Sequence, residues 1–183
     1  MIPSRDECLE LMQRFGMLPN IRKHSLLVYQ VALTIDSLLI SNGSRLNHHL
    51  IEAGALLHDI TKTRALKTGE NHSETGAQLL EQLGFSEVAI VVGQHVNLTP
   101  QENVSFSLTE AKVVNYSDKR VMHDQIVNLD ERFEDIRARY GTTPEKIQRI
   151  RQTEKQARDL ERKILSHLSI PQAYLERLIH EKT

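Results

Sequence analysis

The sequence predicts an all-α fold, a compact bundle of helices, and three observations lead to that prediction. Apolar residues recur at helical spacing over most of the 183 residues, whereas the alternating apolar and polar runs typical of strands are scarce. Aromatic residues, which favour strands, make up only 4% of the chain, and Trp is absent. Hydrophobic residues make up 39%, enough for a packed core, and the length suits one domain with a helical appendage.

Capping and turn residues divide the first two thirds of the chain into helices. Ser4 is the expected cap of a helix that runs to about Phe15, where Gly16 follows as a stop. The following helices are expected at about 21–40, 47–60, 72–83, 86–95 and from about 109 to an end between 118 and 123. The polar segments 61–71 and 100–108 are expected to be loops, the first with room for a short helical turn.

The last part of the chain has a different character and predicts charged helices. Thr143 and Pro144 have the residue types of a helix cap and a first helical position, and this helix is expected to run to about Leu168. Its apolar residues form a narrow stripe, so we expect a solvated amphipathic helix that packs across the domain, with a partner-binding or dimerising helix as the alternative. Pro171 starts a short final helix. The expected units are a main domain over 1–140 and charged C-terminal helices packed on it over 141–183.

Composition excludes several classes of protein. The 23 Lys and Arg against 24 Asp and Glu give a net charge of −1, so no global electrostatic attraction favours nucleic acid or an anionic membrane as a partner. A single cysteine, Cys8, excludes an internal disulfide framework and a multi-cysteine metal site. No apolar run approaches the ~20 residues that span a bilayer, and the N-terminus has no apolar signal region. We expect a soluble, cytoplasmic protein, and the sequence is compatible with an oligomer.

Histidine and aspartate residues fall on helix faces that are otherwise apolar. His58, for example, shares its face with Ile51 and Ala55. The full set in chain order is His24, His58, Asp59, His72, His95 and Asp118. One such histidine is more often an ordinary core residue, and the repetition on successive helices is what favours a shared site. A buried carboxylate without a partner is costly, and a metal ion removes that cost. These nitrogen and oxygen donors suit iron, manganese, nickel, cobalt or zinc.

This order of residues resembles the HD-domain superfamily of metal-dependent phosphohydrolases, over roughly residues 20–120. The motifs that carry the resemblance are His24-Ser25, LLHDITK at 56–62, ENHSETGAQLL at 70–80, QHV at 94–96 and YSDKR at 116–120. The dipeptide followed by Ile60 is similar to the HDIG-like branch, with Thr61 in place of the glycine. The resemblance implies a helical bundle of the HD-domain type over residues 1–140.

The resemblance also implies ligands for two divalent ions. His24, His58, Asp59 and Asp118 would hold the first ion, Asp59 would bridge, and His72 and His95 would hold the second. Two such ions can clamp a phosphate and activate a water for attack on phosphorus. The implied reaction is hydrolysis of a phosphoester in a nucleotide or another small phosphorylated metabolite.

Cationic residues near these motifs are the candidates for substrate binding. Lys62 is expected to bind substrate and to stabilise the leaving group, which makes it a catalytic candidate together with Asp59. Arg22 and Arg120 are further candidates for substrate binding, whereas Lys119 is interpreted as a solvated surface charge.

Two alternatives remain at this point. HD-type enzymes with the same ligands can hold two irons and activate dioxygen, so a di-iron oxygenase is one alternative. The other is a non-catalytic module that a metal stabilises.

The sequence contains a second HD dipeptide, His123-Asp124. No apolar run like the one before His58 precedes it, so it is interpreted as structural or exposed.

Overall fold

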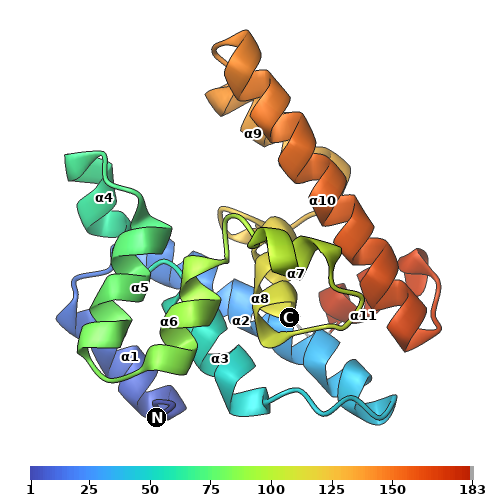
Figure 1. Cartoon of the computed structure of the whole chain (residues 1–183), viewed down its shortest axis with the longest axis horizontal. Coiled ribbons are helices and arrows are strands. Elements are labelled where there is room, and N and C mark those ends of the chain that lie inside the picture. Colours follow the sequence, from blue (N-terminus) through green and yellow to red (C-terminus); the bar gives the residue numbers. More distant parts are fainter. Residues whose placement is uncertain (182–183) are drawn as a thin grey trace.

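A computed structural model describes residues 1–181 and confirms the all-α fold class. The last two residues of the predicted C-terminal region, 182–183, lie outside the described residues. The helices are α1 (Arg5–Arg14), α2 (Pro19–Ser41), α3 (His48–Leu57), α4 (Lys62–Thr68), α5 (His72–Gln82), α6 (Ser86–Gly93), α7 (Pro100–Val104), α8 (Glu110–Lys119), α9 (Leu129–Tyr140), α10 (Pro144–Leu168) and α11 (Gln172–Glu181). Figure 1 shows the long α10 running from the bundle outward beside α9.

Capping side chains fix several helix starts at the predicted places. The Ser4 hydroxyl accepts from the Glu7 backbone N–H, and the Glu7 carboxylate accepts in return from the Ser4 N–H, a complete capping box. Thr143 caps α10 and Pro144 occupies its first position. The predicted apolar stripe of α10 is confirmed, because Ile150, Ala157, Leu160, Ile164 and Leu168 are buried.

Two segments expected to be loops contain helices. Residues 62–68 form α4, which ends at Gly69 with φ of +75°, a conformation that glycine adopts without strain. Residues 100–104 form α7, and Thr99 caps it before Pro100. This Thr-Pro pair is the same start signal as Thr143-Pro144, and the polar composition of the segment concealed it.

The chain beyond α8 also differs from the sequence prediction. The helix ends at Lys119, within the predicted range, but an unpredicted two-stranded antiparallel hairpin follows. In it β1 (Val121–Met122) pairs with β2 (Gln125–Ile126) in the register Val121↔Ile126. Helix α9 was not predicted, although Asn128 and Glu131 form a capping box at its start. The division into 1–140 and 141–183 stays a prediction, and α9 and α10 pack against each other across it.

The core is built around α2 and α3. Helix α2 packs on α3, α8, α10 and α11, and α3 packs on α1, α6 and α8. Gly54 lets α3 approach α6 closely, because a Cβ at this position would lie 2.5 Å from Cγ1 of Val91. This close approach brings the C-terminal ends of α3 and α6 together, and these ends carry two of the predicted ligands, His58 and His95.

Helix α2 has the length and composition of a membrane-spanning helix, contrary to the expectation that no apolar run approaches that length. In this fold 50% of its apolar window is buried, and the helix carries buried His24 and Asp36. The core helix of a helical bundle has the same properties, so α2 is weak evidence for a membrane. The cytoplasmic location expected from composition stays a prediction.

Candidate metal centre

The structure brings all six predicted ligand residues together in two groups of three. His24 of α2, His58 after α3 and Asp118 of α8 form one group, whose ligand atoms lie within 4.8 Å of one another. The second group meets the same limit and consists of Asp59 after α3, His72 of α5 and His95 after α6. His58, Asp59 and His95 lie in turns just beyond helix ends, whereas the sequence predicted that they lie within the helices at about 47–60 and 86–95.

Asp118 joins the imidazoles of the first group. Its Oδ1 lies 3.1 Å from Nε2 of His24 and 3.7 Å from Nε2 of His58. The rings of His24 and His58 approach edge to face, with centroids 5.4 Å apart. All three residues are at least nine-tenths buried, so bulk water does not solvate the Asp118 charge fully.

Asp59 lies between the two groups. Its Oδ2 faces His58 Nε2 at 3.4 Å, while its Oδ1 faces His72 Nε2 at 3.3 Å and His95 Nε2 at 3.6 Å. The Nε2 atoms of His72 and His95 are themselves 3.1 Å apart. One carboxylate therefore contacts imidazoles of both groups, which is the arrangement that a bridging ligand requires.

Three of the imidazoles are oriented in the same way. In each, Nδ1 faces a backbone carbonyl oxygen, and Nε2 points into the cluster. The Nδ1 contacts are His24 to His123 at 3.1 Å, His58 to Ala55 at 2.8 Å, and His95 to Val92 at 2.7 Å. A carbonyl oxygen only accepts hydrogen bonds, so Nδ1 must donate the proton, and the neutral ring presents the Nε2 lone pair to the cluster. Imidazoles that ligate metals are commonly held in this manner.

The cluster contains buried polar atoms that have no hydrogen-bond partner among the described residues 1–181. Nε2 of His58 and Oδ1 of Asp59 are such atoms, and both residues are 0% exposed. Lone pairs of imidazole nitrogens and carboxylate oxygens face one another here, and like partial charges repel unless a positive charge lies between them. The residues therefore fit a divalent cation.

The protonation equilibria of the same residues indicate the same need for positive charge. Burial opposes ionisation of Asp59, but His58 and Lys62 outweigh it and hold the pKa of the carboxyl well below its usual range. Burial disfavours a charged His58, but Asp59 outweighs it and raises the imidazole pKa. Burial lowers the pKa of His95 to about 4, so this ring is neutral near pH 7.

Two lysines contact the cluster. Lys62 Nζ donates to Oδ2 of Asp59 at 2.7 Å. Lys119, interpreted from the sequence as a solvated charge, is buried, and its Nζ donates to the carbonyl of His95 at 2.6 Å and lies 3.5 Å from Oδ2 of Asp118. Burial lowers the pKa of this ammonium. Lys119 therefore ties Asp118 on α8 to the turn that carries His95.

The structure does not bring the two predicted arginines to the cavities beside the cluster. The Arg120 guanidinium is fully buried at the C-terminal end of α8, where it donates to the carbonyl of Val127 and the hydroxyl of Tyr116, both at 2.8 Å. Arg22 is half-buried on α2 and lines neither of the cavities beside the cluster. Arg22 lies two residues before His24 on α2, hence about 200° around the helix axis from it.

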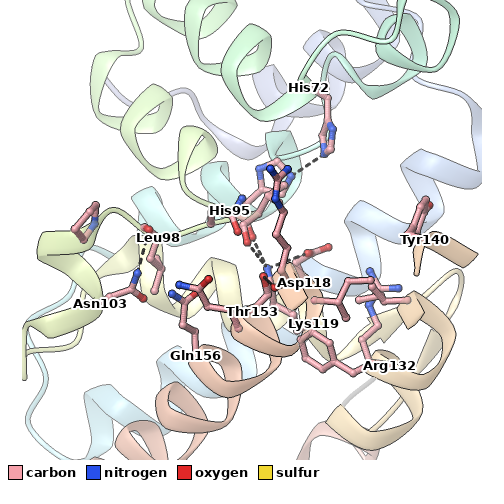
Figure 2. A pocket seen from close by; sticks show the side chains of 18 of the residues that line it. His72, His95, Leu98, Asn103, Asp118, Lys119, Arg132, Tyr140, Thr153 and Gln156 are labelled. Atoms are coloured by element: carbon pink, nitrogen blue, oxygen red, sulfur yellow. Dashed lines mark hydrogen bonds and ion pairs between the residues drawn. The ribbon is translucent and has the colours of Figure 1, made fainter. Parts of the chain in front are cut away.

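A cavity of about 840 Å³ opens beside the cluster, and a second of about 400 Å³ adjoins it. The larger cavity is bordered by His72, His95 and Asp118, as Figure 2 shows. One carboxylate, that of Asp118, lines this cavity. Four basic side chains line it as well, and they are those of Lys62, Lys119, Arg132 and Arg149. Arg132 and Arg149 come from α9 and α10, and sequence reasoning missed them; the capping box before α9 was the signal that could have placed the first.

The second HD dipeptide has a structural role, as predicted. His123 has a positive φ of 57° in the β1–β2 turn, and its carbonyl oxygen orients His24. Asp124 pairs at the surface with Lys23 at 2.7 Å. The side chains of both turn residues are exposed and lie outside the two groups of ligands.

Comparison with known families decides the affiliation. The HD domain model matches residues 21–123, more than half of the chain. The chain belongs to the HD domain family. The matched segment of this HD domain protein includes all six residues of the cluster and ends at the β1–β2 turn, so α9, α10 and α11 lie beyond it.

Relatives of this HD domain protein are distant. An uncharacterized protein of Methanocaldococcus jannaschii is 27% identical, over 72% of this chain and 83% of that protein. Two proteins named tRNA (cytidine(56)-2'-O)-methyltransferase, from Picrophilus torridus and Thermoplasma volcanium, are 28% and 25% identical; this chain matches 40% and 42% of their lengths. No solved structure matches the chain.

Proposed function

We propose that this HD domain protein is a metal-dependent phosphohydrolase that cleaves a phosphoester of a nucleotide or another small phosphorylated metabolite. One observation carries the proposal. Buried Nε2 lone pairs of His24, His58 and His95 point at the carboxylates of Asp59 and Asp118, beside a cavity with cationic walls. The buried cluster needs cations, and the cavity next to it suits an anion.

The six residues of the cluster would hold the ions. The two groups support two sites, with His24, His58 and Asp118 in one and Asp59, His72 and His95 in the other. Nitrogen and oxygen donors of this kind suit iron, manganese, nickel, cobalt or zinc. Bound divalent ions would supply an activated water at neutral pH and positive charge against the phosphoryl oxygens.

The protein's own residues would hold the ligand side chains in place and contact the substrate. Asp59 has one oxygen toward each half of the cluster, and Lys62 holds its Oδ2 through a charge-assisted hydrogen bond. Lys119 fixes the spacing between Asp118 and His95. The Lys62 side chain is 36% exposed, so its ammonium is accessible to the phosphate of a substrate in either cavity.

The size of the larger cavity supports a small substrate. Its volume of about 840 Å³ lies within the range of sites for cofactor-sized ligands. The relatives named as tRNA methyltransferases bring RNA into consideration. Because the chain covers only 40% and 42% of those proteins, we propose no methyl transfer for it.

The test is turnover by the full chain after its metals are removed and restored. Protein treated with chelator would be reloaded separately with manganese, iron, cobalt, nickel and zinc. Each form would then be assayed for phosphate release from nucleotides, phosphomonoesters and phosphodiesters, with tRNA included. We expect release that at least one metal restores and chelator abolishes.

His49→Ala provides a control for this test. His49 lies in the first turn of the core helix α3, but its side chain is 77% exposed and lies outside the cluster. We expect it to retain wild-type turnover, whereas His95→Ala loses it. Absence of turnover in every metal-loaded form, or metal-independent turnover, contradicts the proposed function.

A further inference from the structure

Arg132 is an arginine in the wall that the two cavities share. It lies in the first turn of α9, whose buried Leu129 and Phe133 dock the helix on the core. Its side chain is only 17% exposed, and it lines both cavities. In the view of Figure 2, Arg132 lies across the pocket from His72. The packing of α9 therefore places this guanidinium next to the proposed metal centre.

The guanidinium N–H groups of Arg132 donate no hydrogen bond to any acceptor within residues 1–181. Its Nε is buried and has no hydrogen-bond partner. The guanidinium has one ion pair among the described residues, a long one of 3.7 Å from Nη1 to Oδ2 of Asp135, and Arg139 approaches the same oxygen at 3.5 Å. A buried donor without an acceptor is unfavourable, and a bound ligand is one way to satisfy it.

The two lysines of the same cavity differ from Arg132 in this respect. The Lys62 ammonium already donates to Asp59, and the Lys119 ammonium donates to the carbonyls of His95 and Val96. Their charges face the cavity, but their hydrogen bonds hold the protein together. Arg132 combines a charge in the cavity wall with donors that no acceptor uses.

We propose that Arg132 is a substrate-binding residue that holds the phosphate of the substrate through Nε and Nη donors. The planar guanidinium matches two phosphate oxygens at once, which a lysine does not. The inference rests on the proposed function and deepens it. It makes α9, which lies beyond the matched residues 21–123, part of the phosphate site.

The experiment measures binding of inorganic phosphate, a product of the proposed reaction, to the metal-loaded full chain by calorimetry. We expect Arg132→Ala to weaken phosphate binding roughly 10- to 100-fold, the usual scale for a lost charge-assisted hydrogen bond. Arg132→Lys should have an affinity between those of Arg132→Ala and the wild type. A lysine keeps the positive charge but lacks the planar guanidinium that donates to two phosphate oxygens at once. Metal content should be that of the wild type in both variants.

Arg137→Ala is the matched control. Arg137 lies on the same helix, pairs with Glu154 of α10 and lines neither cavity, so the variant loosens α9 without removing a cavity donor. We expect wild-type phosphate affinity. Unchanged affinity in Arg132→Ala, or an equal loss in Arg137→Ala, overturns the inference.

Hydrolysis separates this inference from the proposed function. If the wild type cleaves phosphoesters and Arg132→Ala leaves KM unchanged, the inference fails and the proposed function stands. If phosphate binding depends on Arg132 but no metal-loaded form cleaves any phosphoester, the inference is supported and the proposed function fails.

Discussion

The six-ligand cluster and the α9–α10 hairpin (residues 129–168) contain ionisable side chains in opposite circumstances. In the cluster, His58 and Asp59 are fully buried, and polar atoms of both lack hydrogen-bond partners. In the hairpin, acids and bases pair at the surface, as Arg158 does with Asp130 and Glu154. These surface pairs therefore need no ligand, whereas the cluster needs cations.

The comparison also explains why Arg132 stands out. Five of the ten Lys and Arg residues of the hairpin have an acidic partner within 3.5 Å, such as Arg137 with Glu154 or Lys155 with Asp159 at 3.2 Å. Arg132 resembles the cluster residues instead, because it is largely buried and has an unpartnered nitrogen. A buried guanidinium nitrogen without a hydrogen-bond partner among residues 1–181, in the wall of two cavities, indicates a ligand site.

The largest effect is expected from Asp59→Ala. This carboxylate contacts both groups of ligands, so its loss should remove most of the bound metal and reduce hydrolysis about a thousandfold or more, the scale for removing a group that acts throughout the reaction. Metal analysis and the phosphate-release assay measure the two effects.

Asp36→Asn serves as the control for that variant. Asp36 is as buried as Asp59 but pairs with His48 at 2.6 Å, about 18 Å along α2 from His24. It should lose stability and keep its metal. Equal metal loss in both variants would mean that any buried aspartate affects metal content through the fold, and would break the comparison.

A smaller effect is expected at the junction of the two regions. The buried Tyr116 hydroxyl on α8 donates to Oε1 of Glu161 on α10 at 2.7 Å and accepts from Arg120 at 2.8 Å. Tyr116→Phe leaves both partners with an unsatisfied group, so we expect a loss of about 1–3 kcal/mol in the free energy of unfolding and unchanged metal content. Urea denaturation measures the loss.

Tyr140→Phe is the matched control at that junction. Tyr140 is 56% exposed, so loss of its hydroxyl should change the free energy of unfolding by less than about 0.5 kcal/mol. Equal stability of the two phenylalanine variants would contradict a coupling of α8 and α10 through this network.

The smallest effect is expected in the hairpin itself. Arg158 is 36% exposed, and its partner Asp130 is 81% exposed, so Arg158→Ala should cost less than about 1 kcal/mol. The difference from the wild type should shrink as salt screens the pair, which denaturation at low and high ionic strength would show. A larger, salt-independent loss would mean that the hairpin, like the cluster, depends on buried charge.

Sequence reasoning was sufficient for the fold class and for the convergence of the cluster. Capping residues such as Ser4 and Thr143 fixed helix starts. The candidate ligands follow apolar residues at helical spacing, although His58, Asp59 and His95 lie in turns just after their helices. Local signals of this kind act over one or two turns, so a single sequence displays them. The assignment of the cluster as a two-metal site stays a prediction.

Sequence proximity was a poor guide to the cavity walls. Arg120 follows Asp118 by two residues, yet it lies just beyond the end of α8 and its guanidinium is buried in the core. Arg132 is 14 residues beyond Asp118 in the printed sequence, and it reaches the cavity because α9 folds back on the bundle. Only tertiary packing decides such placements.

Metal stoichiometry tests the central claim most directly. Elemental analysis of anaerobically purified full chain should give two divalent transition-metal ions per molecule. His72→Ala should retain one ion and the wild-type helical content, because His72 belongs only to the second group. A wild type that binds no such ion at saturating metal, or a His72→Ala variant that still binds two, would contradict the account.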